Sequence, residues 1–176
     1  QYGHLRFALT KRLHLQAGLT HESDDRTLYN MRTMRYNTPA YPTPFDNRYG
    51  RHGALTNQFS GMGGIEYQAF NNLMFYGSIR KGFKPGGFTA NNTVVESQLN
   101  PTKPESLLAY EVGFKSDYLH HKLRINGDAF WYDYHNQQMI GLAVIPRYGV
   151  VGQYVNIPKS RIWGVEMEID ANPIDR

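Results

Sequence analysis

The stretch LMFYGSIRKGFKPGGF, residues 73–88, decides the fold of this chain. Apolar residues or glycine alternate with larger or polar residues over 73–80, and this period of two is typical of a half-buried β-strand. The second half places three glycines around Lys84-Pro85, which suits a strand exit that needs unusual backbone angles. The stretch therefore predicts a β-strand that runs directly into a loop.

The same alternation recurs along the chain. Further strands are predicted over residues 4–9, 13–20, 59–67, 106–116, 122–134 and 163–170. Their connections alternate between short turns and long stretches, the long ones covering about 23–53, 84–105 and 135–159. An up-and-down transmembrane β-barrel has this rhythm, because its turns are short on one side of the membrane and its loops are long on the other. Strands of about 9–11 residues also match the length that spans a bilayer.

Composition removes several other classes of protein. The 176 residues include no Cys, which excludes disulfides and Cys-based metal sites. Aromatic residues make up 14%, too many for a disordered tail, and no apolar run is long enough for a transmembrane helix. The net charge of +4 comes from scattered Lys and Arg, so no nucleic-acid partner is predicted.

Alternation alone leaves the partner of the apolar face open. In a soluble β-sandwich, for instance a glycan-binding module, that face packs a core, whereas in a membrane barrel it meets lipid and the polar face lines a wet lumen. A passive porin-like barrel is a further alternative. Seven strands cannot close a bacterial outer-membrane barrel, which has an even number of at least eight, so the membrane interpretation predicts an internal piece of a longer barrel.

Four segments, in this order, resemble the barrel of TonB-dependent outer-membrane receptors. The first is the strand and loop entry at 73–88. The others are PES at 104–106 with AYEVGFKS at 109–116, NGDAFWYDY at 126–134 followed by Gln137-Gln138, and NIPKSRIWGVEME at 156–168. The resemblance covers about 60–173 well and residues 1–59 loosely. It implies an all-β, antiparallel up-and-down transmembrane β-barrel segment of about seven strands, with long extracellular loops and short periplasmic turns.

The resemblance also implies the function. Residues 1–176 are expected to be a partial TonB-dependent receptor β-barrel domain in the outer membrane of a Gram-negative bacterium, with the plug domain and the closing strands absent from this sequence. Such a receptor takes up a ferric siderophore or a similarly scarce ligand, and TonB energises it through the N-terminal part. Its expected partners are outer-membrane lipid, its own plug, TonB and the ligand. Siderophore, haem, cobalamin and oligosaccharide receptors share this barrel and differ in loops and plug.

Two sets of candidate binding residues follow. Guanidinium groups, an ammonium group and aromatic faces in the long connections suit an anionic, aromatic ligand, and the candidates are Arg32, Arg35, Tyr36, Tyr41, Arg48 and Lys84. Charged residues on the polar face of the later strands are expected to line the lumen and contact the plug, namely Glu111, Lys115, Arg124, Asp128, Glu166 and Glu168.

No enzyme, cofactor or protein-bound metal is predicted. Glu166 and Glu168 lie two apart on one strand, as in a ladder facing the lumen, so they do not indicate a glycosidase. The seven His residues show no metal-ligand spacing, and no Ser-His-Asp order or nucleophile elbow is present.

Overall fold

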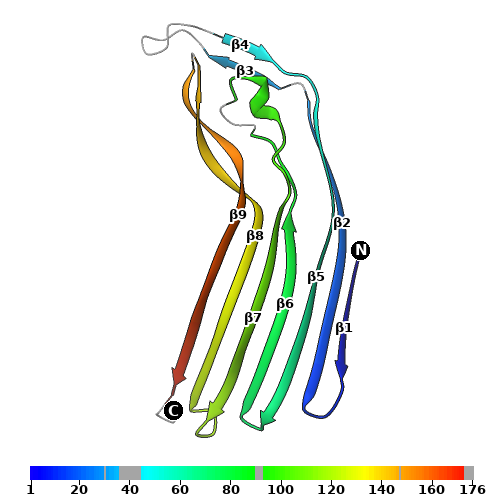
Figure 1. The fold of residues 1–176 in the computed structure, drawn as a ribbon, viewed down its shortest axis with the longest axis vertical. Helices are drawn as coiled ribbons and strands as arrows, with labels where there is room; N and C mark the ends of the chain where they lie inside the picture. Colours follow the sequence, from blue (N-terminus) through cyan, green and yellow to red (C-terminus); the bar gives the residue numbers. More distant parts are fainter. Residues whose placement is uncertain (30, 36–44, 90–92, 147, 173–176) are drawn as a thin grey trace.

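The computed structural model describes the whole chain except residues 30, 36–44, 90–92, 147 and 173–176. Seven strands form one antiparallel sheet in the order β1–β2–β5–β6–β7–β8–β9, so neighbours along the chain are neighbours in the sheet (Figure 1). They are β1 (Tyr2–Ala8), β2 (Leu13–Leu28), β5 (His52–Phe70), β6 (Leu73–Lys84), β7 (Glu105–Tyr118), β8 (Leu123–Ile145) and β9 (Gly149–Ala171). The predicted all-β, antiparallel up-and-down fold is confirmed.

The register of the ladder separates two faces of the sheet. Residues directly opposite each other on paired strands point to the same face, so the pairings can be followed from β1 to β9. One face, called here the outer face, carries large exposed apolar side chains: Leu5, Phe7, Leu15, Leu19, Phe59, Ile65, Tyr67, Phe75, Ile79, Tyr110, Val112, Trp131, Trp163, Val165, Met167 and Ile169. The opposite face, called the lumen face, carries most of the charged side chains of these strands.

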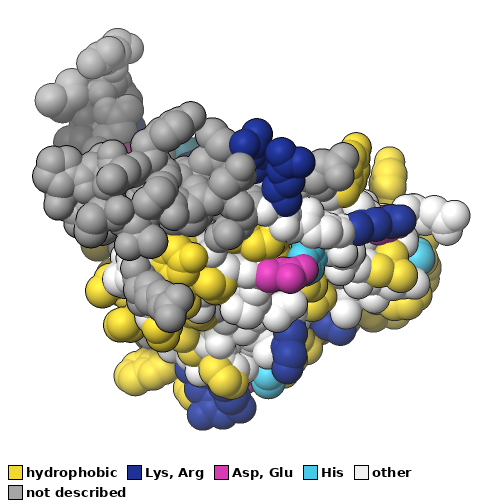
Figure 2. Space-filling view, turned by 90° about the horizontal axis from the view of Figure 1, so that it is seen from above, with side chains coloured by type: hydrophobic (Ala, Val, Ile, Leu, Met, Phe, Trp, Pro, Cys, Tyr) yellow, Lys and Arg dark blue, Asp and Glu magenta, His cyan; other side chains and the backbone are white. Residues whose placement is uncertain are grey.

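The apolar band of the outer face has the length of a membrane crossing. On β9 it runs over 163–171, about 26 Å along the strand at ~3.3 Å per residue. A tilt of ~40° reduces this to about 20 Å, close to the apolar height of outer-membrane barrels. Seen from the loop end, hydrophobic side chains gather along parts of the rim, with Lys and Arg side chains between them (Figure 2).

The strands are longer than predicted, and one predicted connection is wrong. Residues 135–159 were expected to form a long loop, but β8 and β9 continue as a paired hairpin up to Ile145 and Gly149. Inside the expected loop 23–53, β2 and β5 stay paired as far as Leu28 and His52. Backbone hydrogen bonds extend these ladders beyond the apolar band, where side-chain alternation no longer has to follow a lipid face.

Three further elements of the described residues lie within the long connections. The strands β3 (Arg32–Arg35) and β4 (Phe45–Arg48) pair as a separate antiparallel sheet, and η1 (Glu96–Leu99) is a short 3-10 turn. These elements lie at one end of the sheet, and the short turns lie at the other (Figure 1). This division is the one that an outer-membrane barrel shows between its extracellular and periplasmic sides.

A small core holds the loop end together. Its buried side chains come from the 84–105 connection and from the strands around it: Tyr49, Thr56, Thr89, Thr93, Val94, Gln98 and Leu99. Gln98 accepts hydrogen bonds from the backbone N–H of Val94 and of Val95, which closes the turn around η1. The Tyr154 N–H donates to the Thr89 hydroxyl at 2.9 Å, joining the connection to β9.

The β7–β8 turn is strained at consecutive positions. Leu119, His120 and His121 have φ of 53°, 55° and 69°, a region that side chains other than Gly rarely occupy. The side chains of His121 and Arg124 lie 3.3 Å and 3.7 Å from the Asp117 carboxylate, which helps to hold the turn. Within the described residues, no helix is both long and apolar enough to span a membrane.

Candidate functional site

The motif that opens the 84–105 connection is fixed by backbone contacts. Gly86 lies against Thr102, and a Cβ added to Gly86 would collide with the Thr102 carbonyl oxygen. Next to it, the Gly87 N–H donates to the Thr102 hydroxyl at 3.1 Å, and the Thr102 N–H donates to the Gly87 carbonyl at 2.9 Å. The two ends of the connection are therefore held side by side, and only a residue without a side chain fits at position 86.

The β8–β9 hairpin contacts the base of the same connection, which we call the loop root and which consists of Pro85–Gly87 and Thr102–Lys103. The Gln138 side-chain amide donates to the carbonyls of Pro85, at 2.9 Å, and of Lys103, at 3.2 Å. Asn156, opposite Gln138 in the ladder, accepts from the Lys103 N–H and donates to the Lys103 carbonyl. These bonds connect the loop root to both strands of the hairpin. Together, the loop root, Gln138 and Asn156 form one wall at this end of the sheet.

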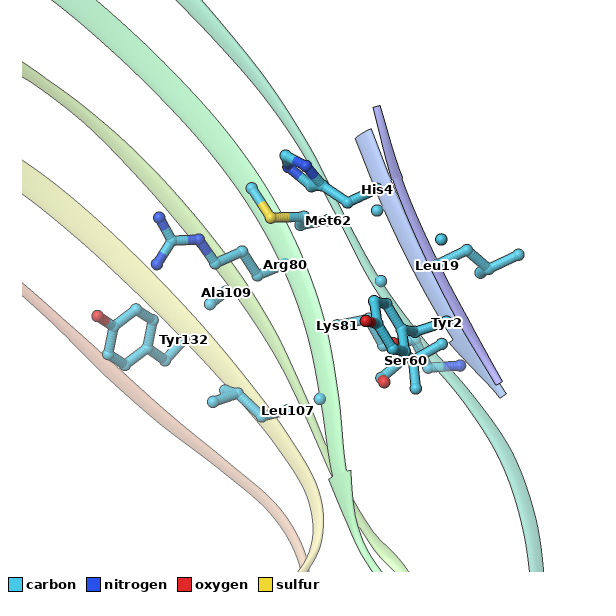
Figure 3. A pocket seen from close by; sticks show the side chains of 15 residues that line it. Tyr2, His4, Leu19, Ser60, Met62, Arg80, Lys81, Leu107, Ala109 and Tyr132 are labelled. Carbon is cyan, nitrogen blue, oxygen red and sulfur yellow. The ribbon is translucent and has the colours of Figure 1, made fainter. Parts of the chain in front are cut away.

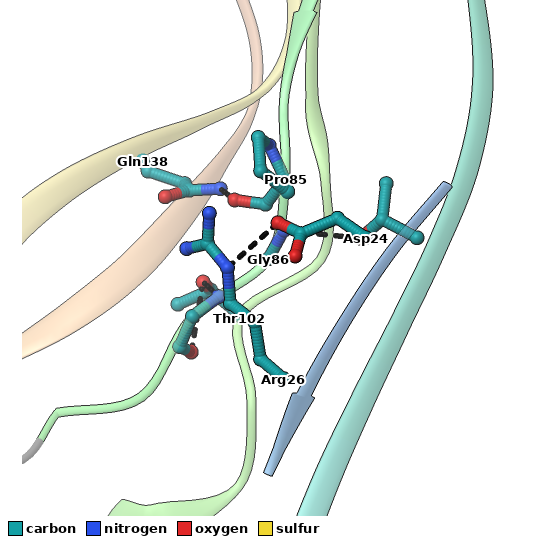
Figure 4. Close-up of polar contacts among 8 residues, drawn as sticks. Asp24, Arg26, Pro85, Gly86, Thr102 and Gln138 are labelled. Atoms are coloured by element: carbon teal, nitrogen blue, oxygen red, sulfur yellow. Dashed lines mark hydrogen bonds and ion pairs between the residues drawn. The ribbon is translucent and has the colours of Figure 1, made fainter. Parts of the chain in front are cut away.

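An ion pair from β2 faces this wall. The Arg26 guanidinium donates to the Asp24 carboxylate at 2.7 Å, and Figure 4 shows both side chains directed toward the Pro85–Gly86 segment and Thr102. The Arg26 side chain is 48% exposed, which leaves its remaining N–H groups accessible. We call the end of the lumen face bounded by Arg26, Lys84, Gln138 and Asn156 the vestibule.

The predicted ligand-binding residues do not all meet in this vestibule. Lys84 ends β6 at the loop root, directly opposite Glu105 of β7. Arg32 and Arg48 face each other in the β3–β4 register, and Arg35 lies opposite Phe45. Tyr36 and Tyr41 lie outside the described residues. Arg26 belongs to the stretch 23–53, whose arginine and tyrosine side chains were considered for an anionic, aromatic ligand; the structure places it on β2 rather than in a loop.

The predicted lumen residues share one face. Glu111 of β7 accepts a hydrogen bond from the Tyr76 hydroxyl at 2.8 Å, and the Lys115 ammonium lies 5.7 Å from the centre of the same ring. Tyr76 was not predicted, although it has the lumen parity of β6. Across β7 and β8, the opposite charges of Asp117 and Arg124 face each other, 3.7 Å apart.

Acidic side chains gather farther along this face. Asp128 of β8 lies directly opposite Glu166 of β9, and Glu168 is opposite Asn126, whose side-chain amide donates to it at 3.0 Å. Like charges at directly opposite positions destabilise a ladder unless a cation lies between them. The Asp128–Glu166 pair thus marks a place where this face is suited to a cationic group.

A hollow of about 600 Å³ lies across the sheet near its loop end. Arg80, Tyr132, Met62 and His4 contribute to its lining, and in Figure 3 Arg80 and Tyr132 extend from neighbouring parts of the sheet into this region. Arg80 was not predicted as a site residue, although its parity places it on the lumen face with Met62 and Ala109. Among the described residues, no three His, Asp or Glu side chains gather as a metal site.

Comparison with known proteins agrees with this arrangement. The family model for the β-barrel of TonB-dependent receptor-like proteins matches residues 1–173. The ferric yersiniabactin uptake receptor FyuA from Yersinia pestis is 19% identical, with a TM-score of 0.70 over 96% of this chain and 23% of that chain. The copper transporter OprC is 15% identical, with a TM-score of 0.76 over 98% of this chain and 26% of that chain.

A third solved structure is the ferric-catecholate import receptor Fiu from K12 E. coli. It is 17% identical, with a TM-score of 0.68 over 98% of this chain and 25% of that chain. At these identities the likeness shows the fold. The chain spans about a quarter of the length of these structures.

Proposed function

Because the chain belongs to the TonB-dependent receptor β-barrel family, we propose that it forms part of the barrel of an outer-membrane receptor for energised uptake. The family consists of transport receptors of the Gram-negative outer membrane, not of enzymes. The observation that carries the proposal is the two-faced sheet, with an apolar outer face of membrane-crossing length, a charged lumen face, and long connections at one end only.

The proposed ligand is a ferric siderophore or a similarly scarce chelate. Two of the similar structures are receptors for ferric complexes by name, ferric yersiniabactin and ferric catecholate. In this chain the vestibule offers Arg26 and Lys84, whose cationic groups suit an anionic chelate. Arg32, Arg35, Tyr36, Tyr41 and Arg48 remain proposed contacts from the long connection before β5.

The proposed partner of the lumen face is the receptor's own plug domain. Cations of the plug would relieve the repulsion between Asp128 and Glu166, and an acidic plug group would pair with Arg80. Glu111, Lys115, Arg124 and Glu168 are proposed contacts on the same face. TonB would act on the N-terminal part of the receptor, so this barrel segment alone is not expected to transport.

Uptake of ⁵⁵Fe-labelled siderophore by cells that carry the full-length receptor tests the proposal. Arg26→Gln with Lys84→Gln is expected to lower ligand affinity roughly tenfold, since each substitution removes a charge-assisted contact. Lys11→Gln, in the β1–β2 turn at the opposite end, is the matched control and should leave uptake unchanged. A protonophore should abolish uptake. Uptake that persists with the protonophore would instead support the passive porin-like alternative.

A further inference from the structure

Three successive rows of side chains cross the outer face at the upper edge of the apolar band. The first row is aromatic, with Tyr110 opposite Trp131 and Trp131 opposite Trp163. Aromatic rings of this kind gather where the hydrocarbon of a membrane meets the headgroups. The row therefore places the upper limit of the hydrocarbon at the level of Trp131 on β8 and Trp163 on β9.

The next two rows, on the loop side, carry cations. Lys81, Leu108, Asp133 and Arg161 follow one another across β6, β7, β8 and β9. One step farther toward the loops, Lys159 of β9 lies opposite His135 of β8. We call Lys81, Lys159 and Arg161 the cationic collar. Its parity directs it away from the lumen, so it belongs to neither the vestibule nor the plug-facing ladder.

Contacts fix the centre of the collar. The Arg161 guanidinium donates to Asp133 at 2.8 Å and lies 5.5 Å from the centre of the Trp131 ring, whose indole N–H donates to the same carboxylate at 3.1 Å. These two hydrogen bonds join Trp131 and Arg161 to one carboxylate, so Asp133 holds Arg161 beside the aromatic row.

The collar has more positive charge than its own acid can balance. The collar has three cations and one carboxylate, that of Asp133, which pairs with Arg161, and within the described residues neither Lys81 nor Lys159 forms an ion pair. Lys81 and Arg161 are three strands apart, about 14 Å at ~4.8 Å per strand, and Lys159 is about 7 Å from Arg161 along β9. This spread matches an anion that presents more than one negative group.

We propose that the cationic collar binds the phosphate groups of an anionic lipid in the outer leaflet, with the acyl chains of that lipid lying on the apolar band below. The inference rests on the proposed function, because it requires the long connections to be extracellular. A lipid bound in this way places its charged headgroup at the interface and its apolar chains beneath it. A basic cluster next to a membrane attracts such anionic headgroups. Among the described strand residues, the aromatic row and the cations meet on the outer face of β6 to β9.

Native mass spectrometry of the full-length receptor in detergent, with added lipid A carrying two phosphates, tests this site. Lys81→Gln with Lys159→Gln is expected to weaken lipid A binding by roughly ten- to thirtyfold, on the scale of the attraction between a basic residue and an anionic surface. Lys11→Gln with Arg12→Gln removes the same charge at the opposite end of the strands and should bind as the wild type does. Dephosphorylated lipid A should bind equally weakly to all three proteins.

The outcomes separate the possible failures. Equal binding of lipid A by the wild type and the collar variant would overturn the inference, as would full competition by millimolar inorganic phosphate, which would indicate a simple anion site. Heat-modifiable gel mobility confirms that each variant is folded. If ligand uptake is normal while lipid A binding does not depend on the collar, the inference fails and the proposed function stands.

Discussion

Gly86 packs backbone to backbone against Thr102, at a distance that leaves no room for a Cβ. Gly86→Ala is therefore expected to displace the loop root, break the hydrogen bonds around Gly87 and Thr102, and cost more than about 1 kcal/mol of local stability. In the full-length receptor, this should appear as faster proteolysis of the 84–105 connection and weaker ligand binding.

Gly82→Ala is the matched control for this substitution. Gly82 belongs to the same sequence motif, but a Cβ at this position would meet nothing within 4 Å. Its proteolysis and ligand binding should equal those of the wild type. If both alanine variants behave alike, the contact with Thr102 does not explain the glycine at position 86.

The two faces of β9 predict opposite responses to a charge. Met167 is 71% exposed on the apolar band, whereas the neighbouring Glu168 points to the lumen. Met167→Lys is expected to destabilise membrane insertion by about 2–4 kcal/mol, the cost of a cation near the middle of a bilayer. Glu168→Lys should leave insertion nearly unchanged. Folding into lipid vesicles, followed by gel mobility, measures both, and equal effects would argue against the lipid-facing assignment.

The repulsion between Asp128 and Glu166 predicts a dependence on the plug. Asp128→Asn should stabilise a receptor barrel from which the plug has been deleted, by a few tenths of a kcal/mol, because it removes a like-charge pair across the ladder. With the plug present, the same substitution should destabilise the barrel, since it removes a partner for a plug cation. Thermal unfolding of the two forms measures the difference. A shift in the same direction in both would show that this pair does not contact the plug.

The strained β7–β8 turn predicts a stabilising substitution. His120 has φ of 55°, so His120→Gly is expected to raise stability by up to about 1 kcal/mol, reduced by the greater flexibility of glycine in the unfolded chain. Asn72→Gly, in the β5–β6 turn, is the comparison. Asn72 is not among the residues with positive φ, so this variant should be less stable than the wild type. Urea unfolding of the full-length receptor provides the measurement.

Side-chain alternation predicted the strands where a lipid face imposes it. The segments around Ile65, Ile79, Val112, Ala129 and Val165 were all located, because every second residue there is apolar. The strand extensions were missed for the complementary reason. Outside the band, the β8–β9 ladder is held by backbone hydrogen bonds, and apolar residues such as Met139 and Ile140 follow one another without alternating.

The site was predicted in part for similar physical reasons. Glu111, Lys115, Asp128 and Glu166 could be assigned to one face, because parity within a strand is readable from the sequence. The bracing of the loop root by Gln138 and Asn156 could not be predicted, since it brings together segments that are more than thirty residues apart. The place of Arg26 on a strand was missed, because the register of β2 continues beyond its apolar part.

The β8–β9 hairpin keeps a single register on both sides of Asn136 and Pro158, where Asn136 has φ of 51° and Pro158 has no N–H to offer the ladder. Removing or adding paired residues at the hairpin tip would shorten or lengthen both strands equally and leave the rows beside the membrane in place. The length and sequence of the hairpin beyond Asn136 and Pro158 can therefore change in evolution while the strand pairing below it is kept. New specificities can arise in this part of the hairpin with little effect on the part of the barrel that must insert into the membrane.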